Sequence, residues 1–286
     1  MASLDRTADE GGVKNPAPPL GRIASTIPRR SLLPGWTIGW LLPVAILGGW
    51  QILASLGWIN ARLFPPPAVL IGTVHELILD GYFWEHVTAT LLRVASGFIL
   101  GAAVATVFGA LTGYSVLAHR LLDPTLQALR NIPSIAWVPI FILWFGIFET
   151  PKVMLIAVGV FFPVYLGLAS AVRDTDRKLV EVGRLYGFTP FAMVRRIFVP
   201  AALPTYMMSL RSGLGLGWMF VVAAEFMGAS EGLGYLLIDG QMTGRPNVVL
   251  SAILLFALLG KLSDIVLERI SLRVLSWQDS FDKTRT

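Results

Sequence analysis

Three charged side chains stand out within the long apolar segments and are the first candidates for chemistry in this chain. They are Arg93, Arg211 and Glu225. A charge inside a membrane is costly and usually faces a cavity or a partner. Arg211 could therefore attract an anionic substrate, although a single arginine near a helix end more often extends to the lipid headgroups. Glu225 could gate a path or pack at an interface. We treat all three as candidates for a translocation path.

Several other kinds of chemistry have no basis in the sequence. No Gly-x-x-x-x-Gly-Lys-Ser/Thr loop occurs, so we do not expect this chain to bind ATP through a P-loop. No Ser/His/Asp or paired-carboxylate constellation stands out in the apolar segments. The chain has no cysteine, which excludes disulfides and thiolate sites, and its three histidines are scattered. We expect no catalytic residue, metal or cofactor on this chain.

A polar, basic island lies between two apolar segments, at residues 179–204. Apolar residues recur there at helical spacing, with Glu181 and several arginines between them. Gly187 can end one helix, and Thr189 followed by Pro190 can begin the next as N-cap and first-turn proline. The pattern predicts two short helices with a sharp bend, suited to dock into a groove on a partner. The alternative is an ordinary basic loop.

The spacing of this island resembles a known signature. In the cytoplasmic loop of bacterial ATP-binding-cassette importer permeases, Glu-Ala-Ala is followed by three residues, a glycine, nine residues and Ile-x-Leu-Pro. The same spacing occurs here, with Val182 and Gly183 in place of the alanines and Val199 in place of the leucine. The resemblance implies that the island is the coupling helix that seats on the ATPase. The residues with this implied role are Glu181, Gly183, Gly187, Pro190, Ile197 and Pro200.

Composition places these residues in a membrane protein. The 286 residues are 55% hydrophobic and 14% charged, whereas soluble domains carry about 25% charged residues. We predict an all-α polytopic protein with six transmembrane helices. The expected spans cover 36–56, 89–116, a third that Pro139 bends or delays and that ends near 148, 151–172, 205–227 and 248–267. The expected domains are a disordered cytoplasmic tail (1–35), a permease domain (36–268) with its coupling loop (173–204), and a cytoplasmic C-terminal tail (269–286).

The second expected span carries small residues at every fourth position. They are Gly97, Gly101, Ala105, Gly109 and Gly113, which leave one helix face nearly bare. In lipid, such stripes allow two helices to pack closely. The pattern predicts close packing without identifying the partner helix.

The charges in the connecting segments set the orientation. Eighteen lysines and arginines, Arg130 among them, fall on the termini and on the loops of the same side, and three fall on the opposite side: Arg62, Lys152 and Arg245. The positive-inside rule then places both termini and the Glu181 loop in the cytoplasm. We expect a multi-pass protein of the bacterial inner membrane, with no nucleic-acid partner.

Further blocks resemble one group of importer permeases, those for sulfonate, taurine, nitrate and related solutes. The blocks are 92–98, 129–139, 143–147, 222–225 and 232–237, and Trp144-Phe145-Gly146 is most similar to aliphatic sulfonate permeases. The resemblance implies a type I permease that acts with a second copy of itself, two ATPase subunits that bind the ATP, and an external solute-binding protein. Nitrate, taurine or a vitamin precursor remain alternative substrates. An ion-coupled secondary transporter or a membrane-embedded enzyme remain alternative classes.

Overall fold

The computed structural model describes residues 35–277, and all regular structure within them is helical. The chain divides into two units, residues 1–46 and 47–286. Helix α1 (Gly35–Ser55) begins in the first unit and ends in the second. The prediction of a disordered N-terminal tail falls almost wholly outside the described residues, as does the end of the C-terminal tail.

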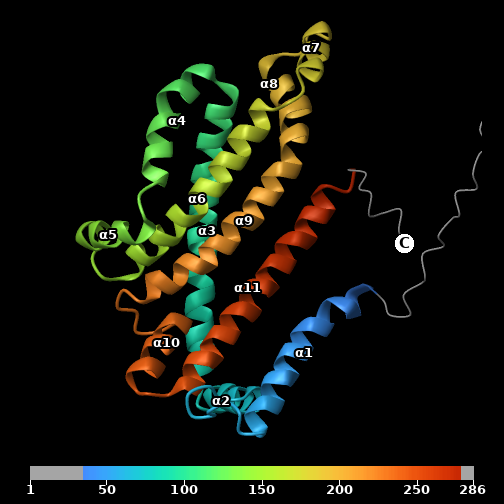
Figure 1. Cartoon of the computed structure of the whole chain (residues 1–286). Helices are drawn as coiled ribbons and strands as arrows, with labels where there is room; N and C mark the ends of the chain where they lie inside the picture. The colour runs from blue at the N-terminus through green and yellow to red at the C-terminus, as the bar shows by residue number, and fades with distance from the viewer. Residues whose placement is uncertain (1–34, 278–286) are drawn as a thin grey trace, which may run out of the picture. The chain divides into compact units, whose positions relative to one another are not determined.

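Three long helices form the core of the second unit: α3 (Tyr82–Tyr114), α6 (Glu149–Arg173) and α9 (Val199–Glu225). Helix α6 packs along both of the others (Figure 1). Its Val160, Val164 and Tyr165 are fully buried, within a cluster that includes side chains of α3 and α9. Helix α6 is therefore the central helix of the core.

The stripe of small residues on α3 packs against α6, which confirms the predicted close packing and identifies its partner. A Cβ atom added at Gly101 would collide with the backbone of Ala157, and one at Gly109 would lie 3.0 Å from the carbonyl oxygen of Tyr165. Helix α9 approaches α6 equally closely, because a Cβ at Gly213 would lie 2.9 Å from Val164. Glycine thus brings both neighbours close to α6.

A second cluster joins α2 (Pro67–Leu79), α10 (Leu233–Met242) and α11 (Pro246–Val274) to the start of α3. The Asn247 side-chain amide donates to the Thr73 hydroxyl (2.9 Å), which ties α2 to α11. Helix α11 continues six residues past position 268, where we expected the C-terminal tail to begin.

The third expected span is a bent pair of helices. Helix α4 (Val116–Arg130) is followed by the 3-10 turn η1 (Ser134–Trp137) and by α5 (Val138–Phe145), with a bend of 98° between the two halves. Pro139 is in the first turn of α5, so the helix begins late, as predicted. The segment after the second span, which we expected to be a loop, is helical over residues 116–130, and Ser115 caps this helix, its hydroxyl accepting from the Ala118 amide (3.2 Å). The cytoplasmic placement of Arg130 stays a prediction.

Within residues 35–277, four helical stretches are long and apolar enough to cross a membrane: α3, α6, residues 190–225 and α11. The bent pair forms a fifth candidate. A total of six spans includes α1 as well, and that count stays a prediction.

Candidate coupling surface and membrane charge cluster

The basic island forms two helices, as predicted. The first, α7 (Arg177–Leu185), begins at Asp176, whose carboxylate accepts from the Lys178 amide (2.9 Å). It ends with Gly187 in the left-handed region at φ 67°. There the Phe188 amide donates to the Gly183 carbonyl, and the Gly187 amide donates to that of Arg184, both at 3.0 Å. These two bonds are a Schellman motif, the helix ending that favours glycine at this position.

The second helix begins two residues later. The Thr189 hydroxyl accepts from the Ala192 amide (3.3 Å), and Pro190 occupies the first turn of α8 (Pro190–Met193). The chain continues through a single π-helical turn, η2 (Val194–Phe198), directly into α9. No residue pattern predicted the π turn, which makes α8 and α9 one continuous helical path.

Five of the six predicted coupling residues lie on this element, and Pro200 is in the first turn of α9. The structure brings Gly183 and Ile197 together. A Cβ at Gly183 would lie 2.6 Å from Ile197 Cδ1 and 2.8 Å from Met193 Sδ. The glycine that replaces the second alanine of the motif therefore permits close contact between α7 and η2. Glu181 is exposed and accepts from Arg177 one turn earlier (3.0 Å).

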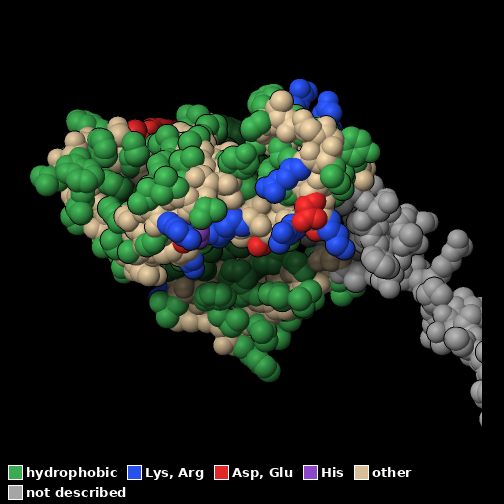
Figure 2. Space-filling model, turned by 90° about the horizontal axis from the view of Figure 1, so that it is seen from above, with side chains coloured by type: hydrophobic (Ala, Val, Ile, Leu, Met, Phe, Trp, Pro, Cys, Tyr) green, Lys and Arg blue, Asp and Glu red, His purple; other side chains and the backbone are tan. Residues whose placement is uncertain are grey.

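The element presents both charge and exposed apolar surface. Leu185, Tyr186 and Phe191 are 86%, 76% and 76% exposed, although arginines and other charged residues surround them in the sequence. Lysine and arginine side chains gather at this end (Figure 2). The basic residues of the segment are Arg173, Arg177, Lys178, Arg184, Arg195 and Arg196. Exposed aromatic and aliphatic side chains among arginines are typical of a protein-binding surface.

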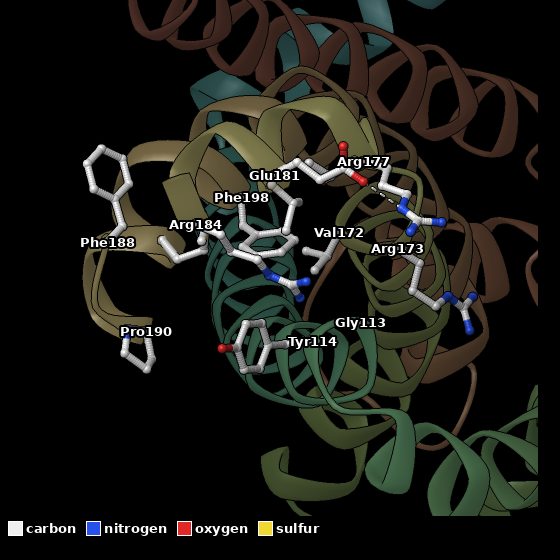
Figure 3. Close-up of a pocket in the computed structure, with 13 residues that line it drawn as sticks. Gly113, Tyr114, Val172, Arg173, Arg177, Glu181, Arg184, Phe188, Pro190 and Phe198 are labelled. Atoms are coloured by element: carbon white, nitrogen blue, oxygen red, sulfur yellow. Dashed lines mark hydrogen bonds and ion pairs between the residues drawn. The ribbon is translucent and has the colours of Figure 1, made fainter. Parts of the chain in front are cut away.

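A cavity of about 840 Å³ lies between this element and the ends of α3 and α6. Arg184, Phe198 and Tyr114 point into it from α7, η2 and α3 (Figure 3). The Arg177–Glu181 pair lies at its rim. Open space therefore separates parts of α7, α8 and η2 from the ends of α3 and α6.

The structure brings Arg93 and Glu225 together at the opposite end of the core. Arg93 is 3% and Glu225 0% exposed, and the guanidinium donates to the carboxylate at 2.9 Å. Arg93 also holds Glu149 at the start of α6 with two bonds, of 2.6 and 2.9 Å. Glu149 in turn accepts from Lys152 (2.8 Å).

Polar groups of α3 and α10 complete this cluster. Glu225 accepts from the Thr90 hydroxyl (2.7 Å) and from the Gly234 amide (2.6 Å). The Gly232 amide donates to His86 Nδ1 (3.0 Å). The start of α10 is thus hydrogen-bonded to α3 and α9, and the charges of Arg93 and Glu225 are fully partnered.

Arg211 lies apart from that pair. It forms a bidentate pair with Asp264 of α11 (2.9 and 3.0 Å) and reaches Glu268 (3.2 Å). Arg93, Arg211 and Glu225 were predicted from the sequence, whereas their partners Glu149, Asp264 and Glu268 were not. An acid at a span end was the available signal, because an intramembrane arginine needs a counter-charge.

With this geometry in place, the comparisons with known proteins are informative. Residues 97–276 match the family model for the inner membrane component of binding-protein-dependent transport systems. The chain belongs to that family. It is a permease subunit of an ATP-binding-cassette importer for a small solute, a multi-pass inner membrane protein, and such subunits are not catalytic themselves. Among residues 35–277, no group of His, Asp and Glu could hold a metal ion.

Two bacterial relatives indicate the branch of the family. The chain is 40% identical to the putative aliphatic sulfonates transport permease protein SsuC of Bacillus subtilis, over 87% of this chain and 90% of that protein. It is 39% identical to the protein of the same name in Escherichia coli, over 82% and 90%. The fold resembles the inward-facing MetNI methionine transporter, with a TM-score of 0.56 at 22% identity, over 68% of this chain and 95% of that one. The predicted type I permease fold is confirmed.

Proposed function

We propose that the chain carries an aliphatic sulfonate across the inner membrane, driven by ATP hydrolysis in separate subunits. The observation that carries the substrate is the 40% and 39% identity to two permeases named for aliphatic sulfonates, over more than four fifths of the chain. Identity is lower to the taurine permease of Escherichia coli (28%) and to a nitrate permease of Leptolyngbya laminosa (30%).

We infer that two copies of the chain assemble with two ATPase subunits and an external binding protein. In this assembly the ATPase holds α7 and α8 through their exposed apolar residues. When the ATPases close on ATP, the movement passes from α8 through η2 into α9, because these form one helical path. The contact of Gly183 with Ile197 makes α7 move with it. Helix α9 then shifts against α6, which changes access to the path.

The orientation is part of the same proposal: both termini and α7 are cytoplasmic. Because the chain has no cysteine, single cysteines are clean probes. An impermeant thiol reagent on intact cells should label cysteines at Asp80 and Thr243, which lie in turns at the proposed outer side, and not one at Ser3. Labelling at Ser3 alone would reverse the orientation.

A deletion strain tests the function directly. It should lose growth on alkanesulfonates as sole sulfur source, keep growth on sulfate, and recover with the gene in trans. The permease should copurify with an ATPase subunit, and uptake should resist a protonophore while ATP is maintained. Protonophore-sensitive uptake without an ATPase would favour the secondary transporter. Normal growth on both sulfur sources would favour nitrate, taurine or a vitamin precursor.

A further inference from the structure

We propose that the break between α4 and α5 holds an anion site inside the membrane, with Arg130 as its charged ligand. The inference rests on the proposed function, because the anion we assign to the site is the sulfonate group of the transported solute. The inference names a place in the fold and specific residues for substrate binding. Neither the coupling motif nor the sequence identity to relatives indicates where the substrate binds.

The break opens into a cavity of about 480 Å³ that is bounded by α6 and α9. Arg130, Asn131 and Ser134 line it from the break, and residues between Val158 and Leu166 line it from α6. Val158 is nine residues from the first residue of α6 and Leu166 is seven from its last. At 1.5 Å per residue the cavity lies roughly 10–14 Å from either end of that helix. Arg130 therefore lies near the middle of the membrane-spanning part.

Arg130 differs from the other two membrane arginines in having no counter-charge. Arg93 and Arg211 each pair with two or more carboxylates. Within residues 35–277 the guanidinium of Arg130 makes no hydrogen bond and no ion pair, and the residue is exposed. Charged side chains at this depth face a water-filled cavity or a ligand and mark substrate paths. Discontinuous helices near the bilayer midplane are also where transporters bind solutes.

The lining suits a molecule with one anionic end and one apolar end. A guanidinium can donate two parallel hydrogen bonds to an oxyanion. The Asn131 amide and the Ser134 hydroxyl can serve the remaining oxygen of a sulfonate. The rest of the cavity is mostly apolar and matches an alkyl chain; its apolar side chains include Val158, Phe162, Leu166, Leu216 and Phe220. The volume falls within the range of small-molecule sites.

The test is uptake of radiolabelled butanesulfonate into proteoliposomes that contain the whole importer. Arg130→Gln removes the positive charge, and Ser134→Ala removes one hydroxyl. Arg130→Lys keeps the charge but lacks the two parallel N–H donors of the guanidinium. Arg120→Gln is the matched control, because Arg120 is also exposed on α4 and makes no ion pair within the described residues. We expect Arg130→Gln to raise the KM for uptake at least about tenfold and Ser134→Ala about threefold, the ranges for charged and neutral hydrogen bonds. Arg130→Lys should fall between them, and Arg120→Gln should match the wild type.

Three outcomes would overturn the site. Wild-type KM in Arg130→Gln would remove Arg130 as a ligand. A defect that appears only in liposomes with anionic lipid would assign Arg130 to a lipid headgroup. If the importer dissociates in Arg130→Gln but stays assembled in Arg130→Lys with a normal KM, the arginine instead pairs with an acidic residue of the second copy. The proposed function fails separately, when the wild-type importer itself takes up no butanesulfonate.

Discussion

The two ends of the core use charge in opposite ways. At one end Arg93 and Glu225 are buried, and each makes at least three hydrogen bonds to groups on other segments. At the other end the Arg177–Glu181 pair is 90% and 55% exposed and lies within one helix. The buried cluster joins α3, α6, α9 and α10, whereas the exposed pair joins nothing but consecutive turns of α7.

This difference separates a part that holds the helices together from a part that is available to a partner. Removing one member of a buried pair leaves an uncompensated charge and costs about 3–5 kcal/mol. Removing one member of an exposed pair costs about 0–1 kcal/mol. A surface that must bind and release another subunit can change its contacts only if its own fold does not depend on them.

The largest expected effect comes from Arg93→Met, compared with Arg177→Met. Arg93→Met leaves Glu225 fully buried with only the Thr90 hydroxyl and the Gly234 amide. We expect a loss of about 3–5 kcal/mol, against less than about 1 kcal/mol for Arg177→Met. The measurement is thermal unfolding of the purified permease in detergent.

The double variant Arg93→Met/Glu225→Gln sharpens this test. Because it removes both charges, it should recover part of the lost stability. Equal melting temperatures for Arg93→Met and Arg177→Met would contradict the conclusion that the buried pair stabilises the fold more than the exposed pair does.

The next largest expected change in stability comes from the stripe of small residues that packs α3 against α6. Gly101→Ala places a methyl group against the Ala157 backbone, which cannot move unless the helices separate. We expect a loss of about 1–3 kcal/mol, the usual cost of overpacking. Gly215→Ala on α9 is the control, since a Cβ there meets no atom within 4 Å. A destabilised Gly215→Ala with an unchanged Gly101→Ala would contradict the assignment of α6 as the partner of the stripe.

Arg211 provides an intermediate case, because its pair with Asp264 is partly exposed, at 35% and 29%. We expect Arg211→Gln to cost about 1 kcal/mol and to leave the KM for sulfonate uptake unchanged. A rise in KM without a change in melting temperature would instead give Arg211 the substrate role that its position in the sequence suggested.

The sequence was most informative where structure is local. Gly187, Thr189 and Pro190 end one helix and begin the next through contacts with residues close to them in the sequence. The bend was therefore predictable from residue type and spacing alone. The stripe on α3 was equally visible, but its partner α6 is set by tertiary packing. The same holds for Glu225, whose partners Arg93 and Thr90 lie more than 130 positions away.

Arg130 shows the limit of the charge pattern. A basic residue just before an apolar run resembles a loop flank, and the positive-inside count assigned it to the cytoplasm. The fold shows that residues 116–130 form a helix and that, together with α5, they make a bent pair long and apolar enough to be one span. The anion site proposed above places Arg130 in the interior of that pair. The depth of a residue depends on how helices are bent. Pro139 predicted a bend or a late start of the third span, but no local pattern encoded an angle of 98°.

The central claim is that the bend at Gly187 transmits the movement of the ATPase. A valine there would be strained by about 1 kcal/mol or more in the left-handed region and would displace α8. Gly244→Val is the matched control, because Gly244 has φ 62° and, like Gly187, open space around it, at the opposite side of the core.

The measurement is ATPase stimulation by loaded binding protein in the reconstituted importer, with uptake recorded alongside. Gly187→Val should insert and dimerise with a melting temperature close to that of the wild type, yet lose both stimulation and uptake. Gly244→Val should keep its ATPase subunits and its stimulation. Wild-type stimulation and uptake in Gly187→Val would contradict the account and reduce α7 and α8 to a basic connector.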